Sequence, residues 1–404
     1  MVSKGWKRRR RRSKHGTYCS NVSQTEAGTL IAEPNAPPPI IEVIAYGPDG
    51  IVEQKIANPL EAASLIGKWP VVWVNVDGLG DASVIESIGR QFDLHELAME
   101  DVMCTHQRAK VDQYDKHLFI VLRMLSWDKT HVQSEQLSIF AGNGFVVTFQ
   151  EKAGGDCLGP TRDRIRRGTG KVRQQGADYL LYSVVDSVVD GYFPVVEGIG
   201  DELEALEDEI LDRVNRYTPA RVMDAKREVL FVRHSAWPLR DVVNSLTRDD
   251  SSDFVSEHTQ VYMRDCYDHC MRIIDLVETQ REMCSDMMDL YLSSVSNRMN
   301  EVMKVLTTIT LLFMPPTLIA GIYGMNFHWI PELSWKYGYF YALGLMAVTA
   351  VGFLTYSRLN GWLSNDTTRD TERNIPSETA HGHAHAIPAE QTSLPPAKAD
   401  LPTS

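Results

Sequence analysis

The sequence predicts an α/β domain that lies in water, followed by a long stalk helix that continues into a two-helix transmembrane hairpin. Between residues 40 and 177, short apolar segments with strand periodicity alternate with helical patterns, which indicates an α/β domain. From residue 178 onward only helical patterns continue. Two later stretches, 305–327 and 337–357, contain no Asp, Glu, Lys or Arg, and each is long enough to cross a bilayer as a helix.

Four segments of the α/β domain read as strands, because they are rich in Val, Ile, Leu or Phe and end at turn residues. Helical patterns lie between the second and third of them. In chain order we expect strands at 41–45 and 71–76, helices at 82–92 and 94–103, and strands at 118–122 and 145–149.

Long helices are expected in the next part of the chain. One helix should cover 179–214, and a second should open at Thr218-Pro219, with Pro238 kinking or interrupting it. A third pattern runs from about residue 255 towards 318. A helix of about 60 residues would be ~90 Å long and would not be stable alone. It must therefore pack against the preceding helices or against copies of itself.

These patterns divide the chain into successive segments. They are a basic and Pro-rich tail (1–39), the α/β cytoplasmic domain (40–177), a helical pair of that domain (178–254), the stalk helix (255–304), a first transmembrane helix (305–327), an extracytoplasmic loop (328–336), a second transmembrane helix (337–358) and a polar tail (359–404). Both tails are expected to be disordered, because their composition cannot bury enough apolar surface to fold.

Charge predicts the orientation and the kind of partner. Lys304 and Arg358 flank the hairpin, so the positive-inside rule places both termini in the cytoplasm of an inner-membrane protein, although Lys336 in the loop favours the opposite. The net charge is −12 despite a strongly basic start at residues 1–15. An acidic domain beneath a membrane suggests a cationic partner rather than nucleic acid, with the basic arm touching anionic lipid.

One face of the third helical pattern carries polar side chains at regular intervals. The positions recur by sevens with one step of eleven, and both spacings keep residues on one face of a helix. In order they are Asp268, Asp275, Glu282, Asp289, Asn300, Thr307, Met314 and Gly321. In a ring of identical helices this face would line a cation path with an acidic mouth. A solvated acidic face followed by a packing seam explains the same spacing, and both interpretations stay open.

The motif Tyr323-Gly324-Met325-Asn326 ends the first apolar stretch and places an amide at the mouth of a membrane helix. Mg²⁺ prefers oxygen ligands and gives up its water reluctantly. A ring of neutral amide oxygens therefore suits a hydrated ion in transit, whereas carboxylates would hold the ion too tightly. The sequence has no G-x-x-x-x-G-K-[ST] phosphate loop, so an ATP-driven pump is disfavoured, and we expect no enzymatic activity.

The motif Tyr323-Gly324-Met325-Asn326-Phe327, with Pro331-Glu332-Leu333 and Trp335 after it, resembles the signature of the CorA family of magnesium and cobalt transporters. The similarity covers residues 40–363 through ordered segments at 100–101, 106–108, 237–240, 264–269, 291–297 and 300–306. The resemblance implies a funnel-shaped homopentamer whose first transmembrane helix lines an ion channel. It also implies Mg²⁺ as substrate and regulatory ligand, with Co²⁺ or Ni²⁺ as further ions.

The same resemblance assigns roles to individual residues. The expected selectivity and pore residues are Gly324, Met325, Asn326, Gly321, Thr317, Met314, Leu306, Asn300 and Asp289. A regulatory metal would lie between Asp101 of one subunit and Asp265 of the next, with Glu100 as a second ligand, and Glu332 would attract cations at the outer loop. Helical spacing selects Thr307 where the resemblance selects Leu306, so we expect the helix to twist or bend there.

The facing carboxylates suggest how transport would be regulated. Asp101 and Asp265 repel each other unless a divalent ion bridges them, so bound Mg²⁺ would favour the packed, closed arrangement. Cytoplasmic Mg²⁺ would then shut its own route of uptake. Two alternatives remain, namely a Zn²⁺ transporter of the same fold and a membrane-anchored sensor or scaffold that conducts nothing.

Several features depart from the family pattern or stand outside it. His328 lies where the family often carries an acid, and the usual run of lysines after the second span is missing, so the Arg8 to Arg12 run is expected to supply surface charge instead. The tail segment 381–385 holds three histidines that would bind Ni²⁺, Co²⁺ or Zn²⁺ only loosely. Cys266 and Cys270 flank His269 like a thiophilic metal site, but ordinary apolar packing is the favoured interpretation.

Overall fold

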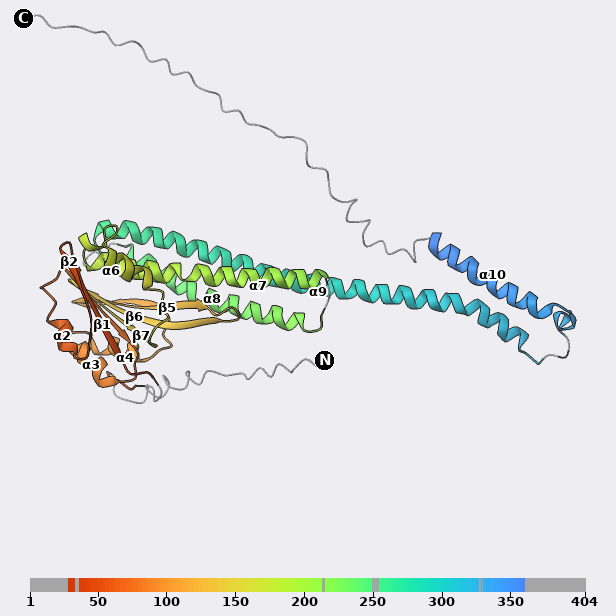
Figure 1. The fold of residues 1–404 in the computed structure, drawn as a ribbon, viewed down its shortest axis with the longest axis horizontal. Helices are drawn as coiled ribbons and strands as arrows, with labels where there is room; N and C mark the ends of the chain where they lie inside the picture. The colour runs from red at the N-terminus through yellow and green to blue at the C-terminus, as the bar shows by residue number, and fades with distance from the viewer. Residues whose placement is uncertain are drawn as a thin grey trace, which may run out of the picture. The chain divides into compact units, whose positions relative to one another are not determined.

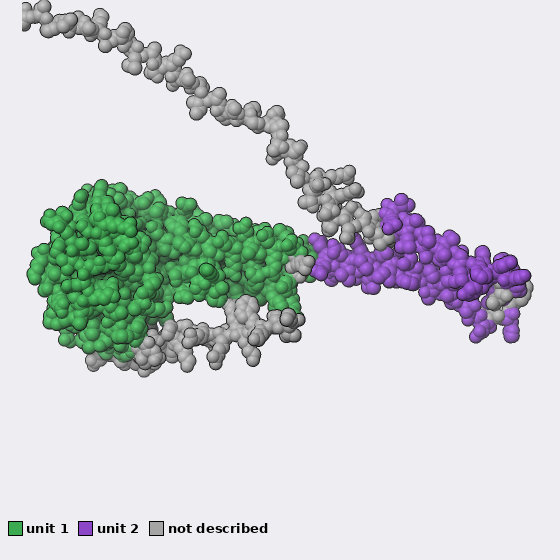
Figure 2. All heavy atoms as spheres, in the orientation of Figure 1, with its two compact units in different colours: residues 1–296 green, residues 297–404 purple. Residues whose placement is uncertain are grey.

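The computed structural model describes residues 28–32, 36–212, 215–248, 254–326, 328 and 330–359, and the side chains of Glu332 and Leu333 are excluded from that description. The expectations for the basic run at Arg8 to Arg12 and for the histidines of 381–385 fall outside these residues. The chain forms two compact units, residues 1–296 and 297–404 (Figure 2). Each unit is described separately below.

A seven-stranded sheet forms the centre of the first unit, in the order β2-β1-β3-β7-β6-β5-β4 (Figure 1). Its strands are β1 (Ile40–Gly47), β2 (Gly50–Ile56), β3 (Val71–Asp77), β4 (Lys110–Gln113), β5 (His117–Trp127), β6 (Val132–Gly142) and β7 (Phe145–Gln150). Only the central pair β3–β7 is parallel. The predicted α/β class is confirmed, and the four predicted strands are β1, β3, β5 and β7.

Each face of the sheet packs against its own set of helices. Successive residues of β3 point to opposite faces, so Trp73 and Val74, both fully buried, belong to different cores. One core lies under α3 (Ala82–Gln91) and α4 (Glu96–Met103), with α2 (Pro59–Ala63) nearby. The other core includes α5 (Gly159–Arg167), η2 (Val172–Gln174) and the long helices that follow.

The long helices are α6 (Ala177–Asp190), α7 (Tyr192–Asp212), α8 (Thr218–Leu246) and α9 (Glu257–Tyr323). The prediction of one helix over 179–214 is wrong, because the chain divides at Gly191 into α6 and α7. Glycine is a weak helix former, and Pro194 in the next turn has no N–H to continue the hydrogen-bond ladder. As a result, α6 ends at the acidic residue Asp190.

Pro238 was expected to kink or interrupt its helix. It does not interrupt α8, which continues through this position. A proline inside a helix costs about 3 kcal/mol. The neighbouring Ala236, Leu239, Val242 and Val243 are all nearly fully buried in the core. Each large apolar side chain that is fully buried contributes about 1.5–3 kcal/mol, so their burial outweighs the cost of the proline.

The second unit contains the C-terminal part of α9, the short helix η4 (Pro331–Ser334) and α10 (Gly338–Leu359). The helices α9 and α10 are long and apolar enough to cross a membrane, and only 6% of each apolar window is buried within the chain. Large side chains such as Leu318 and Val348 are about two-thirds exposed, at 64% and 69%. Apolar surface of this extent requires lipid or other protein against it.

The contact between α7 and β5 yields a test of the first unit. A Cβ added to Gly198 would lie 2.4 Å from the indole of Trp127, a distance that real side chains do not tolerate. Gly198→Ala should therefore lower the free energy of unfolding by about 1–2 kcal/mol, although alanine is the better helix former. Denaturant unfolding followed by tryptophan fluorescence measures this change.

Gly159 at the start of α5 is the matched control, because a Cβ there meets no atom within 4 Å. Gly159→Ala should leave the free energy of unfolding unchanged or slightly higher. A Gly198→Ala variant as stable as wild type would show that Trp127 does not hold α7 in this position.

Candidate ion-conduction and metal-sensing sites

The end of α9 positions the amide at the mouth of the first apolar span. The N–H of Gly324 donates to the Ala320 carbonyl at 2.9 Å, and that of Met325 donates to the Ile322 carbonyl at 3.2 Å, which closes the last turn. A Cβ on Gly324 would stand 3.0 Å from the Ala320 oxygen, so glycine fits this turn best. Asn326 follows directly and is exposed, with no partner for its side chain among the described residues.

Five predicted pore residues, four within the apolar span and one just before it, lie along α9 and are all exposed. They are Gly321, Thr317, Met314, Leu306 and Asn300, and the alternative position Thr307 is exposed as well. The Thr317 hydroxyl donates to the Phe313 carbonyl at 2.7 Å, so its oxygen keeps lone pairs for a ligand. Because all of them lie on α9, contacts within the described part of the chain do not bring these residues together.

Asp101 on α4 is held by two donors of its own chain. The amide nitrogen of Gln107 donates to Asp101 Oδ1 at 2.7 Å, and Lys110 Nζ donates to Asp101 Oδ2 at 2.7 Å. The adjacent Glu100 accepts a hydrogen bond from the Gly28 backbone at 3.0 Å. These contacts fix both carboxylates at the C-terminal half of α4, which is where a metal that joins two subunits was expected.

Asp265 lies on the outer face of α9 and is exposed, as is Asp289 further along the same helix. No hydrogen bond or ion pair among the described residues joins Asp265 to Asp101. The single chain therefore leaves Asp265 available to another molecule. The side chain of Glu332, the expected outer-loop acid, falls outside the described residues.

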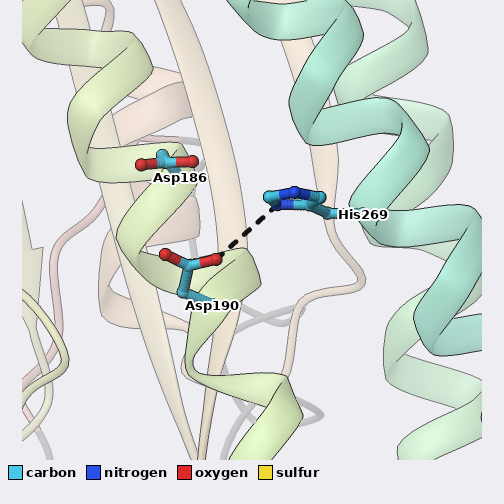
Figure 3. Close-up of side chains that lie close together, drawn as sticks. All are labelled: Asp186, Asp190 and His269. Carbon is cyan, nitrogen blue, oxygen red and sulfur yellow. Dashed lines mark ion pairs between the residues drawn. The ribbon is translucent and has the colours of Figure 1, made fainter.

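A cluster that sequence patterns did not reveal lies between α6 and α9. Possible ligand atoms of Asp186, Asp190 and His269 all lie within 4.8 Å of one another (Figure 3). His269 Nδ1 is 3.7 Å from Asp190 and is buried without a hydrogen-bond partner among the described residues. Burial and the nearby Asp190 raise the pKa of Asp186. A divalent cation would relieve the repulsion between the two carboxylates.

The neighbouring thiols do not complete this cluster as metal ligands. Cys266 Sγ lies 3.5 Å from Asp186, and Cys266 and Cys270 are both almost fully buried. Burial raises the pKa of the Cys270 thiol to about 12 and also raises that of Cys266. Because the thiolate is the form that binds metal, the interpretation as apolar packing fits these two residues. The one sequence sign of the cluster was the i, i+4 spacing of Asp186 and Asp190.

Comparison with known proteins identifies the family. The family model described as CorA-like Mg²⁺ transporter protein matches residues 70–358. The cobalt/magnesium transport protein CorA of Thermotoga maritima is 43% identical over 325 residues, which cover 80% of this chain and 92% of that protein. The putative metal ion transporter YfjQ of Bacillus subtilis is 37% identical over 299 residues, covering 73% of this chain and 91% of the relative.

The fold agrees with the sequence matches. The solved structure of the CorA magnesium transporter from Methanocaldococcus jannaschii superposes with a TM-score of 0.66 at 23% identity, covering 80% of this chain and 99% of that one. The chain that carries the Gly324-Met325-Asn326 motif thus also has the α/β unit, the long α9 and the second apolar helix α10. This chain belongs to the CorA family of Mg²⁺ transporter proteins.

Proposed function

We propose that this chain forms a homopentameric channel that carries Mg²⁺ across the cytoplasmic membrane and closes when cytoplasmic Mg²⁺ rises. The single observation that carries the proposal is Asn326, whose amide has no partner among the described residues and lies directly beyond the uncharged, exposed end of α9 in a member of a Mg²⁺ transporter family. Co²⁺ is a further substrate, since the relative from Thermotoga maritima is a cobalt/magnesium transport protein. Ni²⁺ has a similar ligand preference and is a third candidate.

The exposed face of α9 supports a path made from several copies. An ion in hydrocarbon is costly, so each exposed polar group in the span needs a water-filled or protein-lined space. A ring of copies would bring the Asn326 amides together at the outer end and the Met314 and Leu306 side chains together deeper in. The amides would bind a hydrated ion through oxygen, and the apolar rings would close the path by excluding water.

Both termini would lie on the cytoplasmic side of the membrane. The cytoplasmic domain would sense Mg²⁺ at two places. Asp101 of one subunit would meet Asp265 of the next, and an ion between them would hold the copies together. The cluster of Asp186, Asp190 and His269 would bind a second ion inside each subunit. Its position between α6 and α9 would link metal occupancy to the helix that carries the pore residues.

Replacing the Asn326 amide tests the conduction path. Asn326→Ala should reduce Mg²⁺ uptake into proteoliposomes by at least about tenfold, because the mouth loses the oxygen that replaces part of the ion's hydration. A Mg²⁺-sensitive dye inside the liposomes measures the uptake. Thr349→Ala on α10 is the control and should keep full uptake. Unaltered uptake by Asn326→Ala would favour a membrane-anchored sensor over a channel.

Neutralising the stalk carboxylate tests the regulation. Asp265→Asn should leave a persistent current at a cytoplasmic Mg²⁺ concentration that silences the wild type, because the ion loses one of its two anionic ligands. Recording from membrane patches measures the effect. Glu86→Gln on α3, which removes a carboxylate paired only with Arg90, should close normally. Full closure of Asp265→Asn would place the sensor elsewhere.

The imidazole of His269 predicts a difference between ions at the second cluster. Imidazole suits Co²⁺ and Ni²⁺ better than Mg²⁺, which prefers oxygen. His269→Ala should therefore raise the Co²⁺ concentration that gives half of the thermal stabilisation by about tenfold. The Mg²⁺ concentration that gives half of its stabilisation should change much less. Asp186→Asn should weaken both. Equal Co²⁺ response in His269→Ala and wild type would contradict a metal site here.

A further inference from the structure

Lys110 connects Asp101, the proposed Mg²⁺ ligand, to a second acid, Asp112. Its Nζ is 2.7 Å from Asp101 Oδ2 and also 2.7 Å from Asp112 Oδ2. Lys110 and Asp112 are two positions apart on β4, so both side chains point to the same face of the sheet. Phe119 lies opposite Asp112 on β5, and its ring is 5.5 Å from the ammonium.

Two carboxylates hold the ammonium in this position, since both ion pairs are 2.7 Å long. The Lys110 and Asp101 side chains are only 35% and 26% exposed, so solvent screens this pair less than an ordinary surface pair. Lys110 therefore places its positive charge directly at the carboxylate.

Both oxygens of Asp101 already have donors in the single chain. Gln107 occupies Oδ1 and Lys110 occupies Oδ2. Each oxygen keeps a further lone pair, so a divalent cation can approach Asp101, but the ammonium 2.7 Å from Oδ2 repels the ion until Lys110 moves away. The free energy of the ion's binding is reduced by the cost of that displacement.

We propose that Lys110 is a built-in competitor for Asp101, and that it sets the cytoplasmic Mg²⁺ concentration at which the channel closes. The proposal rests on the proposed function, because it needs Asp101 as a ligand of the regulatory ion. When Mg²⁺ is scarce, Lys110 neutralises the charge of Asp101, so Asp101 does not bind the next subunit through an ion. When Mg²⁺ is abundant, the ion replaces the ammonium and recruits Asp265 of the next subunit.

Asp112 lowers the free-energy cost of replacing Lys110 by Mg²⁺ at Asp101. Because Lys110 already bonds to Asp112 at 2.7 Å, it can leave Asp101 and keep one anionic partner without crossing the domain. Asp112 is 41% exposed, so water can also reach the displaced ammonium. An incoming ion can therefore displace Lys110 from Asp101. The Mg²⁺ concentration at which the channel closes then depends on how strongly Lys110 pairs with Asp101 relative to Asp112.

The experiment compares the cytoplasmic Mg²⁺ concentration for half-closure in patches that contain full-length variants. Lys110→Met should lower this concentration by about fivefold to tenfold, the size expected for removing a half-buried charge in contact with the ligand. Asp112→Asn should raise it, because Lys110 then has only Asp101 as an anionic partner. Lys110→Arg, which keeps the cation, should stay closer to wild type than Lys110→Met.

Arg108→Gln is the matched control, since Arg108 is a nearby cation whose ion pair is with Asp241 and not with Asp101. It should leave the half-closing concentration unchanged. An unchanged or higher value for Lys110→Met would overturn the proposal, as would an equal shift for Arg108→Gln. Thermal unfolding without Mg²⁺ shows whether each variant is folded. If Lys110→Met is not folded, Asp112→Asn carries the test, and a half-closing concentration that is not raised in that variant would overturn the proposal.

Asp101→Asn separates this proposal from the proposed function. If Asp101→Asn abolishes closure while Lys110→Met closes at the wild-type concentration, the regulatory site stands and the competitor role of Lys110 is wrong. If Asp101→Asn closes like wild type, Asp101 is not a ligand and the proposed regulation is wrong as well.

Discussion

The cost of placing a charge in hydrocarbon determines where this chain can keep its acids. The stretches 305–327 and 337–357 contain no ionisable side chain of the Asp, Glu, Lys or Arg type. Any ion that passes along α9 must therefore be stabilised by neutral oxygens and by water that it brings with it. Along α9 the carboxylates all lie before residue 305, where binding can be tight because the ion does not have to leave quickly.

The same constraint explains why the chain is incomplete by itself. One copy of α9 leaves Met314, Leu306 and Asn300 largely exposed. Among the described residues Asp265 is likewise exposed and has no hydrogen-bond or ion-pair partner, whereas Asp101 is occupied by Lys110. The pore and the sensor would thus be completed by the same event, which is the packing of further copies around α9. Under the proposed function, this shared requirement would let an ion in the cytoplasmic domain influence the width of the path.

The sequence predicted the parts of the fold in which periodicity and composition agree. Strands β1, β3, β5 and β7 are apolar runs, whereas β4 has only four residues and β2 exposes a polar Glu53-Gln54-Lys55 segment, so both were missed. Gly191 was overlooked as the end of α6 because the apolar pattern continues across it. Local patterns carry little information about such boundaries, since packing decides them.

The candidate sites were predicted unevenly for a related reason. Asn326 could be identified because one short motif at the end of an apolar helix contains the chemistry. The pairing of Asp101 with Lys110 depends on how α4 packs beside the edge strand β4. The cluster of Asp186, Asp190 and His269 joins residues about 80 positions apart on two helices. Spacing along a sequence cannot reveal contacts of this kind.

The central claim is that copies of this chain form a Mg²⁺-conducting path that cytoplasmic Mg²⁺ closes. The most direct measurement is the current through wild-type protein in a planar bilayer with Mg²⁺ as the only permeant cation. The account predicts an inward Mg²⁺ current at low cytoplasmic Mg²⁺ that falls to the baseline as Mg²⁺ is raised on that side alone. A bilayer that stays silent at every Mg²⁺ concentration, or a current that does not respond to cytoplasmic Mg²⁺, would contradict it.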